Sequence, residues 1–151
     1  MDAWFEEDEQ VFVHARDPYH RVDVVPTSRH IRVSFGGEVV AETRRANALF
    51  ETGLPTRWYI PRNDVRHEVL ETSASSTRCP YKGVASYRSV RAGAERDEDL
   101  VWSYERPLPA VAGITGQLAF FNERVDIDVD GEREERPRTP WSKGLGREPR
   151  P

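Results

Sequence analysis

The stretch Ile31-Arg-Val-Ser-Phe-Gly-Gly-Glu-Val-Val40 decides the fold class. In its first half, residues 31–35, apolar side chains alternate with polar ones and therefore share one face of an extended chain. Gly36-Gly37 then interrupts the run, and the two valines after Glu38 resume it. Two β-rich runs joined by Gly-Gly predict a β-hairpin.

Similar short runs follow along the chain, separated by glycine and proline. Two other segments, residues 46–53 and 107–114, have lengths that suit one or two helical turns, and Gly53 suits a helix end. Several strands at short spacing without a long amphipathic helix predict a mainly β protein, with antiparallel sheets folded over one core and one or two short helices. The further strands are expected at residues 57–60, 84–90, 100–104, 116–121 and 125–129.

The composition changes after Asp130. Residues 131–151 contain Trp141 and Leu145 as their only large apolar side chains, together with four prolines. Such a stretch buries too little apolar surface to offset the entropy of ordering it. We therefore expect a single β domain over residues 1–130, including a polar N-terminal segment 1–28, and a flexible C-terminal tail over residues 131–151 that is attached at Trp141.

Length and charge limit the possible functions. The chain has 151 residues, a net charge of −4 and a single cysteine. One domain of this size buries a sufficient core without disulfides, and one cysteine excludes both a disulfide and a four-cysteine zinc site. The acidic balance argues against nucleic acid as a partner. No apolar run approaches the roughly 18 residues of a membrane span, and the acidic start is not a secretory signal, so the cytoplasm is the expected compartment.

The segment Arg78-Cys-Pro-Tyr-Lys-Gly83 is the densest group of chemically capable residues. Thiols react as thiolates, which neighbouring cations stabilise, and Arg78 and Lys82 flank Cys79. Cys79 is therefore a candidate nucleophile, and Lys82 a candidate base or amine. The alternative is that Cys79 is a small buried apolar residue at the entry of a strand. A histidine that activates Cys79 would be one of His14, His20, His30 or His67.

A second group is Arg57-Trp-Tyr-Ile-Pro-Arg-Asn-Asp64. In a strand, Arg57 and Tyr59 share one face. The Arg57 guanidinium suits a carboxylate or phosphate, which it binds through two parallel hydrogen bonds. Asp64 would orient Arg57 or serve as a base. The alternative is a structural Arg–Asp pair at a sheet edge.

The third group is Trp102-Ser-Tyr104, whose spacing places both rings on one face of a strand. Such rings commonly form core. The alternative is that they line a cavity together with Tyr81 and Tyr87, because small-molecule sites combine aromatic walls with a few convergent polar groups.

The polar segment from His14 to Asp23 is solvated, or it forms a lid or an anion-binding rim. A metal held by His14, His20 and a carboxylate would need a spacing that matches no familiar motif, so we expect no metal and no cofactor. The sequence also lacks glycine-rich phosphate-binding motifs and the Gly-x-Ser-x-Gly nucleophile motif.

Together these motifs resemble the family called domain of unknown function 427, also filed as a nucleotidyltransferase-like domain. The N-terminal segments Trp4-Phe-Glu-Glu-Asp-Glu and His14-Ala-Arg-Asp-Pro look like a longer bacterial variety of it. The resemblance covers nearly the whole chain. It is carried by Arg57-Trp-Tyr-Ile-Pro with Asp64-Val65, Thr77-Arg-Cys-Pro-Tyr-Lys-Gly, Val101-Trp-Ser-Tyr with Pro107, Leu118-Ala-Phe-Phe, Val125-Asp-Ile and Asp130-Gly131.

The resemblance implies a tent-like β fold, with two antiparallel sheets packed at an angle over a pocket. Other tent-like folds hold zinc between two pairs of cysteines, and with one cysteine this chain does not have that site. The resemblance also implies that the residues at the family's motif positions converge on one pocket. These residues are Arg57, Tyr59, Asp64, Cys79, Tyr81, Lys82, Trp102 and Tyr104.

Three functions remain open at this point. The first is a small-molecule binding protein, in which Arg57, Tyr59, Tyr81, Tyr87, Trp102 and Tyr104 bind an anionic or carbonyl-bearing ligand. The second is an enzyme that uses Cys79, Lys82 and Asp64. The third is a protein-interaction module that uses the charged tail and the N-terminal segment.

Overall fold

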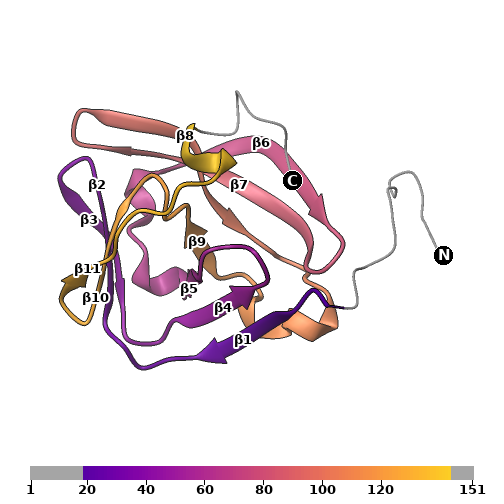
Figure 1. The fold of residues 1–151 in the computed structure, drawn as a ribbon. Coiled ribbons are helices and arrows are strands. Elements are labelled where there is room, and N and C mark those ends of the chain that lie inside the picture. The colour runs from indigo at the N-terminus through magenta and orange to yellow at the C-terminus, as the bar shows by residue number, and fades with distance from the viewer. Residues whose placement is uncertain (1–18, 144–151) are drawn as a thin grey trace.

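The computed structural model describes residues 19–143. Their strands form two antiparallel sheets, and the helical segments among them are short 3-10 turns (Figure 1). The mainly β prediction with two antiparallel sheets is therefore confirmed. Within the described residues no helix has the length and apolar character needed to cross a membrane.

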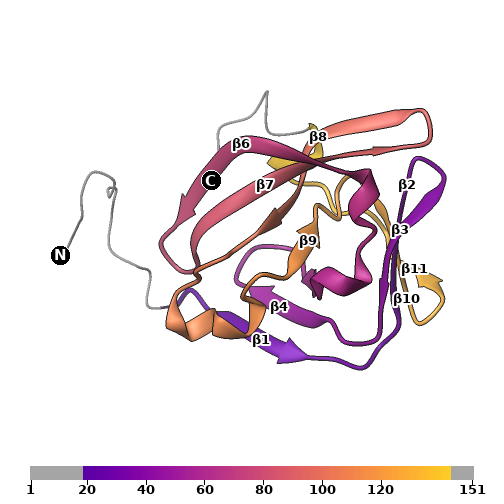
Figure 2. The same cartoon turned by 180° about the vertical axis from the view of Figure 1, so that it is seen from behind.

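The larger sheet has seven strands and curls on itself. Figures 1 and 2 show β1 and β4 facing β6 and β7 across the interior, with β5 and β9 between them. This curl brings residues from the two ends of the sheet close together. The strand order is β1 (Val22–Pro26), β4 (Asn47–Glu51), β5 (Arg57–Ile60), β9 (Leu118–Phe120), β8 (Glu95–Ser103), β7 (Gly83–Ala92) and β6 (Leu70–Cys79).

The smaller sheet contains the hairpin expected around Gly36-Gly37. Its order is β11 (Glu132–Arg133), β10 (Asp126–Val129), β2 (Ile31–Phe35) and β3 (Glu38–Thr43). Along β2 the buried residues alternate with exposed or partly exposed ones, as the sequence pattern predicts. The buried side chains of this sheet belong to the same core as those of the larger sheet.

The expected helix at residues 46–53 is wrong, because this segment forms strand β4. It pairs with β1 on one side and with β5 on the other. Leu49 is fully buried, whereas the next side chain, Phe50, is 45% exposed. A segment this short has little helical preference of its own, so pairing on both sides decides its structure.

Besides β4, two strands of the large sheet escaped the sequence analysis, β1 and β6. The first lies within the segment that we expected to be polar, and the second is rich in serine and threonine rather than in large apolar residues. Both are edge strands of the large sheet. Residues 107–114 do contain a short helix, the 3-10 turn η4 (Pro109–Ile114), which packs on β1. The other turns are η2 (Arg62–Asp64), η3 (His67–Val69) and η5 (Pro140–Lys143).

The C-terminal part of the described chain lies on the domain. Residues 132–133 form β11, and the Trp141 ring stacks on Phe121 with a centroid distance of 6.2 Å. Glu134 accepts a hydrogen bond from the Trp58 indole at 3.4 Å. These contacts agree with attachment at Trp141, while the flexible tail and the domain limits stay predictions.

Candidate functional site

Arg57 and Tyr59 of β5 and Trp102 of β8 lie on one face of the curled sheet, which we call the inner face. Tyr59 pairs in register with Ala119, which pairs with Trp102, so the two aromatic residues sit two strands apart on one face. The Trp102 indole donates a hydrogen bond to the Tyr59 hydroxyl at 2.9 Å, and the two rings meet edge to face. This contact divides the inner face into two groups of polar residues.

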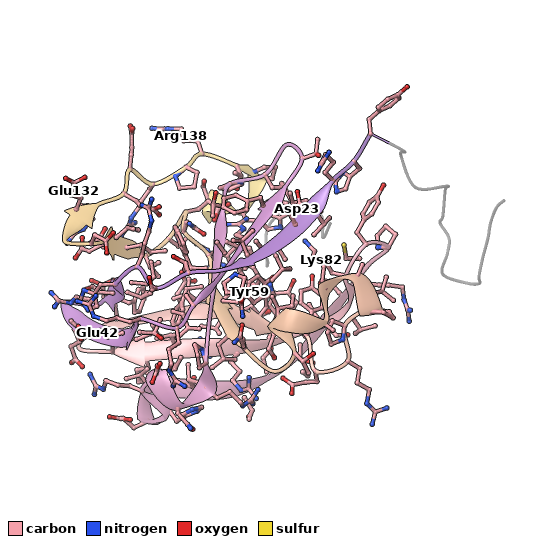
Figure 3. All side chains as sticks on the ribbon, turned by 90° about the horizontal axis from the view of Figure 1, so that it is seen from below. Asp23, Glu42, Tyr59, Lys82, Glu132 and Arg138 are labelled. Atoms are coloured by element: carbon pink, nitrogen blue, oxygen red, sulfur yellow. The ribbon has the colours of Figure 1, made fainter. Side chains whose placement is uncertain are left out.

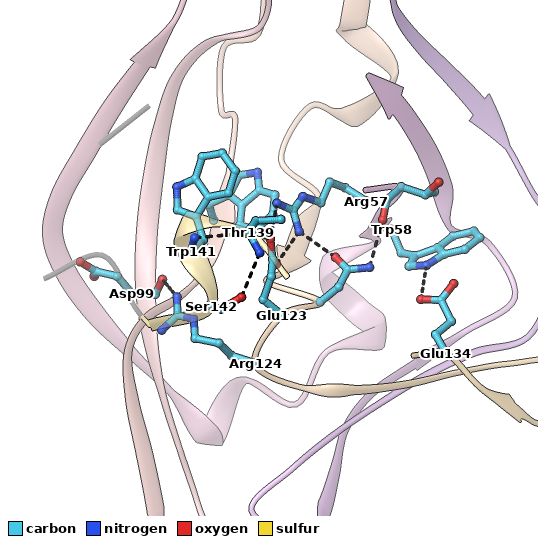
Figure 4. A network of polar contacts seen from close by, with 12 residues as sticks. Arg57, Trp58, Asp99, Glu123, Arg124, Glu134, Thr139, Trp141 and Ser142 are labelled. Atoms are coloured by element: carbon cyan, nitrogen blue, oxygen red, sulfur yellow. Dashed lines mark hydrogen bonds and ion pairs between the residues drawn. The ribbon is translucent and has the colours of Figure 1, made fainter. Parts of the chain in front are cut away.

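The first group centres on Arg57, which is buried. Its guanidinium donates two parallel hydrogen bonds to Glu123, with N–O distances of 2.7 and 3.0 Å, and a third to Asn122 at 3.0 Å. The guanidinium carbon lies 5.3 Å from the Trp102 ring centroid and 5.8 Å from that of Trp141. Figure 4 shows Arg57 directed at Glu123, with Trp141 beside it.

Glu123 itself is completely enclosed, with a side chain that is 0% exposed. Thr139 from the C-terminal segment donates a hydrogen bond to its second oxygen at 2.5 Å. Burial alone would raise the pKa of the Glu123 carboxyl, but the hydrogen bonds and charge of Arg57 outweigh it, so the pKa lies below its usual value. The carboxylate that the sequence analysis expected Arg57 to bind is therefore supplied by the chain.

Asp64 lies elsewhere and does not pair with Arg57. Its carboxylate accepts hydrogen bonds from the Thr43 hydroxyl at 2.7 Å and from Arg45 at 3.1 Å. The expected Arg57–Asp64 pair is therefore wrong, because the partner that the fold brings to Arg57 comes from the loop after β9. Near that loop, Glu123, Ser142 and residues 136–140 line an open hollow of about 420 Å³.

The second group, which we call the tyrosine cluster, consists of Tyr59, Cys79, Tyr87 and Tyr104. Each tyrosine is at most 5% exposed, and Cys79 is partly exposed. Tyr87 pairs in register with Trp102, which donates a hydrogen bond to Tyr59, so both tyrosines neighbour Trp102. The Tyr87 hydroxyl shares a hydrogen bond of 2.8 Å with Thr77.

Tyr104 is buried, with 5% of the residue exposed. Its hydroxyl is not one of the enclosed side-chain atoms of residues 19–143 that lack a hydrogen-bond partner, which are Arg88 Nη1, Arg124 Nε and Trp141 Nε1. Burial raises the pKa of Tyr104 far above its usual value, so the hydroxyl keeps its proton and remains a donor. The backbone is held firmly, because the amide of Gly116 donates to the Tyr104 carbonyl at 3.0 Å.

Glu51, Lys82 and His20 form a second set of interacting residues, which we call the mouth triad. Lys82 bonds one carboxylate oxygen of Glu51, and His20 lies 2.9 Å from the other. The His20 ring stacks on Tyr81 with a centroid distance of 4.0 Å. Glu51 ends β4 and Lys82 lies in the β6–β7 turn, so their ion pair joins the two ends of the curled sheet. Figure 3 shows Lys82 at the end of the molecule opposite Glu42 and Glu132.

The β6–β7 turn is positioned by its backbone. Gly83 has a φ of +117°, and a Cβ at this position would lie 3.3 Å from the carbonyl oxygen of Arg106. The amide of Leu108 donates to the Lys82 carbonyl at 2.9 Å. A glycine at this position therefore allows the turn to approach residues 106–108 and directs Lys82 toward Glu51.

The structure thus brings most of the sequence-predicted residues to one face, but in two groups. Lys82 follows Cys79 of the tyrosine cluster by three residues, and Tyr81 stacks on His20 of the mouth triad. Arg57 lies in the other group. Trp102 contacts both groups, through Tyr59 and through Arg57. Glu51 and Glu123 were missed, because neither belongs to a recognisable motif. Within residues 19–143 no group of three potential metal ligands exists, and His14 lies outside the described residues.

Comparison with known proteins identifies one family. The family model described as "Domain of unknown function (DUF427)" matches residues 23–131. The matched region contains the tyrosine cluster, Glu51, Lys82, Arg57 and Glu123, and it ends before Thr139 and Trp141. No curated protein matches the chain.

Proposed function

The chain belongs to the DUF427 family, a domain of unknown function, and we propose that it binds a small molecule with an anionic or carbonyl group at the tyrosine cluster. The Tyr104 hydroxyl would contact that group. The mouth triad would form the rim of the site, next to the partly exposed Cys79.

The observation that carries this proposal is the group of aromatic rings on one face of the sheet. Trp102 pairs in register with Tyr87 and donates to the Tyr59 hydroxyl, and Tyr104 follows Trp102 by two residues. The Tyr104 hydroxyl keeps its proton, so it would donate a hydrogen bond to a ligand oxygen that reaches it.

The surroundings of Tyr104 suit a small organic molecule. The rings of Tyr59, Tyr87 and Trp102 are buried on the same inner face. Aromatic walls with a small number of oriented polar groups are typical of ligand sites. Donors held by a sheet are also preorganised, because the backbone of each strand is fixed by its neighbours.

A fragment screen observed through the protein's NMR signals tests this proposal. Small amides, ketones and carboxylates should include compounds that shift the backbone signals of residues 79 and 104. Y104F should weaken these compounds roughly two- to tenfold, the usual worth of one neutral hydrogen bond. Tyr19, which is 84% exposed, provides the control Y19F. Binding that maps elsewhere, or that Y104F leaves unchanged, would refute the proposal.

A second candidate is an enzyme with Cys79 as nucleophile, favoured by the position of this partly exposed thiol within the tyrosine cluster. Lys82 is less suited to act as a base, because its ammonium donates to Glu51. Iodoacetamide labelling across pH tests the thiol. Rapid alkylation already near pH 6 would support a nucleophile, whereas the pH dependence of free cysteine would argue against one.

A further inference from the structure

The open hollow beside the C-terminal segment is a second place where the protein can hold a ligand. It has a volume of about 420 Å³ and is lined by Glu123, Ser142 and residues 136–140. We infer that this hollow binds a small organic phosphate. The site goes beyond the proposed function, because none of its lining residues belongs to the tyrosine cluster and all except Glu123 follow residue 131, where the matched family region ends.

The hollow contains a cation that no other group neutralises. The Arg138 side chain is exposed and makes no hydrogen bond or ion pair with any residue of the described part of the chain (Figure 3). Arg136 is only partly engaged, since its Nε and Nη2 donate to one oxygen of Asp126 at 3.3 and 3.1 Å. The Arg138 guanidinium and Arg136 Nη1 therefore remain available to an anion.

The Ser142 hydroxyl adds a neutral donor. Its oxygen accepts a hydrogen bond from the Thr139 amide at 3.1 Å, and its proton is donated to no partner among residues 19–143. The Thr139 hydroxyl in turn donates to Glu123, which places Ser142 close to that carboxylate (Figure 4). A ligand in the hollow would therefore meet the Ser142 hydroxyl as well as the two arginines.

Donors also exceed acceptors in the structure next to the hollow. Within the described range, Arg124 Nε and Trp141 Nε1 are enclosed N–H groups without a hydrogen-bond partner. Both side chains contact the Phe121 ring, and each residue is the chain neighbour of a lining residue. Enclosed polar groups are nearly always paired, so this excess of donors favours a ligand that is rich in acceptors.

The carboxylate in the wall of the hollow does not oppose an anion. The Glu123 side chain is 0% exposed, and Arg57 donates to both of its oxygens. Its charge is therefore neutralised by the guanidinium, and Arg136 and Asp126 form a second neutral pair. The uncompensated charge at the hollow is that of Arg138.

A phosphate suits these donors better than a carboxylate. The arginine fork matches two oxygens of a phosphate, and a phosphate monoester has a third terminal oxygen for another donor. A volume of about 420 Å³ also exceeds that of one phosphoryl group and falls within the range of roughly 300–1,000 Å³ of ligand sites. Pro137 and Pro140 provide apolar surface for the organic part.

Phenyl phosphate and benzyl alcohol are suitable probes, because they share a ring and differ in charge. Near pH 7.5 a phosphate monoester is doubly charged, since its second pKa is about 6. Titrations of the full chain should show phenyl phosphate shifting the backbone NMR signals of residues 138, 139 and 142. Its affinity should exceed that of benzyl alcohol by about tenfold or more, the worth of one hydrogen bond between charged groups.

Three variants test the roles of charge and shape. R138Q should weaken phenyl phosphate by about tenfold, whereas R138K, which keeps the charge without the fork, should weaken it less. The control is R29Q, because Arg29 is also exposed but does not line the hollow. W141A keeps both arginines and removes the ring that attaches the C-terminal segment to Phe121, so it should also weaken the probe.

Each other outcome would overturn the inference. Equal losses in R138Q and R29Q would show attraction to surface charge in general, and full affinity in W141A would show that the arginines act without the hollow. Benzyl alcohol binding as tightly as phenyl phosphate, or no shift at residues 138, 139 and 142, would likewise refute it. Shifts confined to residues 79 and 104 would place the probe at the tyrosine cluster, which would refute this inference and support the proposed function.

Discussion

The buried ion pair between Arg57 and Glu123 allows the most direct physical test of the structure. E123Q keeps the size of the side chain and one acceptor oxygen, but it removes the charge that neutralises the guanidinium. Arg57 would then remain enclosed beside Trp102 and Trp141 as a cation without an anion. We expect E123Q to destabilise the protein strongly.

The magnitude follows from the burial of both partners. The Arg57 and Glu123 side chains are 6% and 0% exposed, so water cannot replace the lost partner. Removing one member of a buried pair costs about 3–5 kcal/mol. Because glutamine still accepts one hydrogen bond, we expect a loss of about 3 kcal/mol, at the lower end of that range.

Urea unfolding followed by tryptophan fluorescence measures this loss. With a slope of about 2 kcal/mol per molar urea, a loss of 3 kcal/mol lowers the midpoint by roughly 1.5 M. The control is E71Q, which makes the same chemical change in a surface pair. Exposed pairs contribute little to stability, so E71Q should lower the midpoint far less.

Equal effects of E123Q and E71Q would refute the argument, because they would show that the Arg57–Glu123 pair is solvated in solution.

A double replacement provides a second check. Exchanging Arg57 for methionine and Glu123 for leucine removes both charges, and such changes are often neutral or stabilising. The double variant should therefore recover most of the stability that E123Q loses.

Three further predictions follow from the same contacts. The pKa of Glu123 is lowered in the folded state. Its contribution to stability is therefore present above the pKa of the unfolded state, about 4.3, and is lost as pH falls below that value. Urea midpoints measured between pH 7 and pH 3 should fall more steeply in the wild type than in E123Q. W141A removes a ring that lies over Arg57 and should cost about 1–2 kcal/mol in urea unfolding, whereas an unchanged midpoint would place Trp141 off the domain. G83A should lose more stability on heating than G53A, because both glycines have positive φ but only Gly83 closely faces backbone atoms; equal losses would contradict that close approach.

Much of the local structure could be predicted from the sequence because a strand's pattern is local. Alternation with a period of two placed Arg57 and Tyr59 on one face, and the contacts of both residues with Trp102 confirm this assignment. The same alternation predicted that Trp102 and Tyr104 share a face. The hairpin at Gly36-Gly37 was predictable for the same reason. Residues 46–53 were not, because their strand depends on pairing with β1 and β5 rather than on their own pattern.

The sequence by itself determined the β class, the positions of most strands, the faces of their side chains and the resemblance to the family. Only the tertiary structure decided which groups meet. Arg57 lies 66 residues before Glu123, and Lys82 lies 31 residues after Glu51. Neither pair leaves a local periodic signal, because each depends on the order of strands in the large sheet and on the curl that brings β4 to the β6–β7 turn.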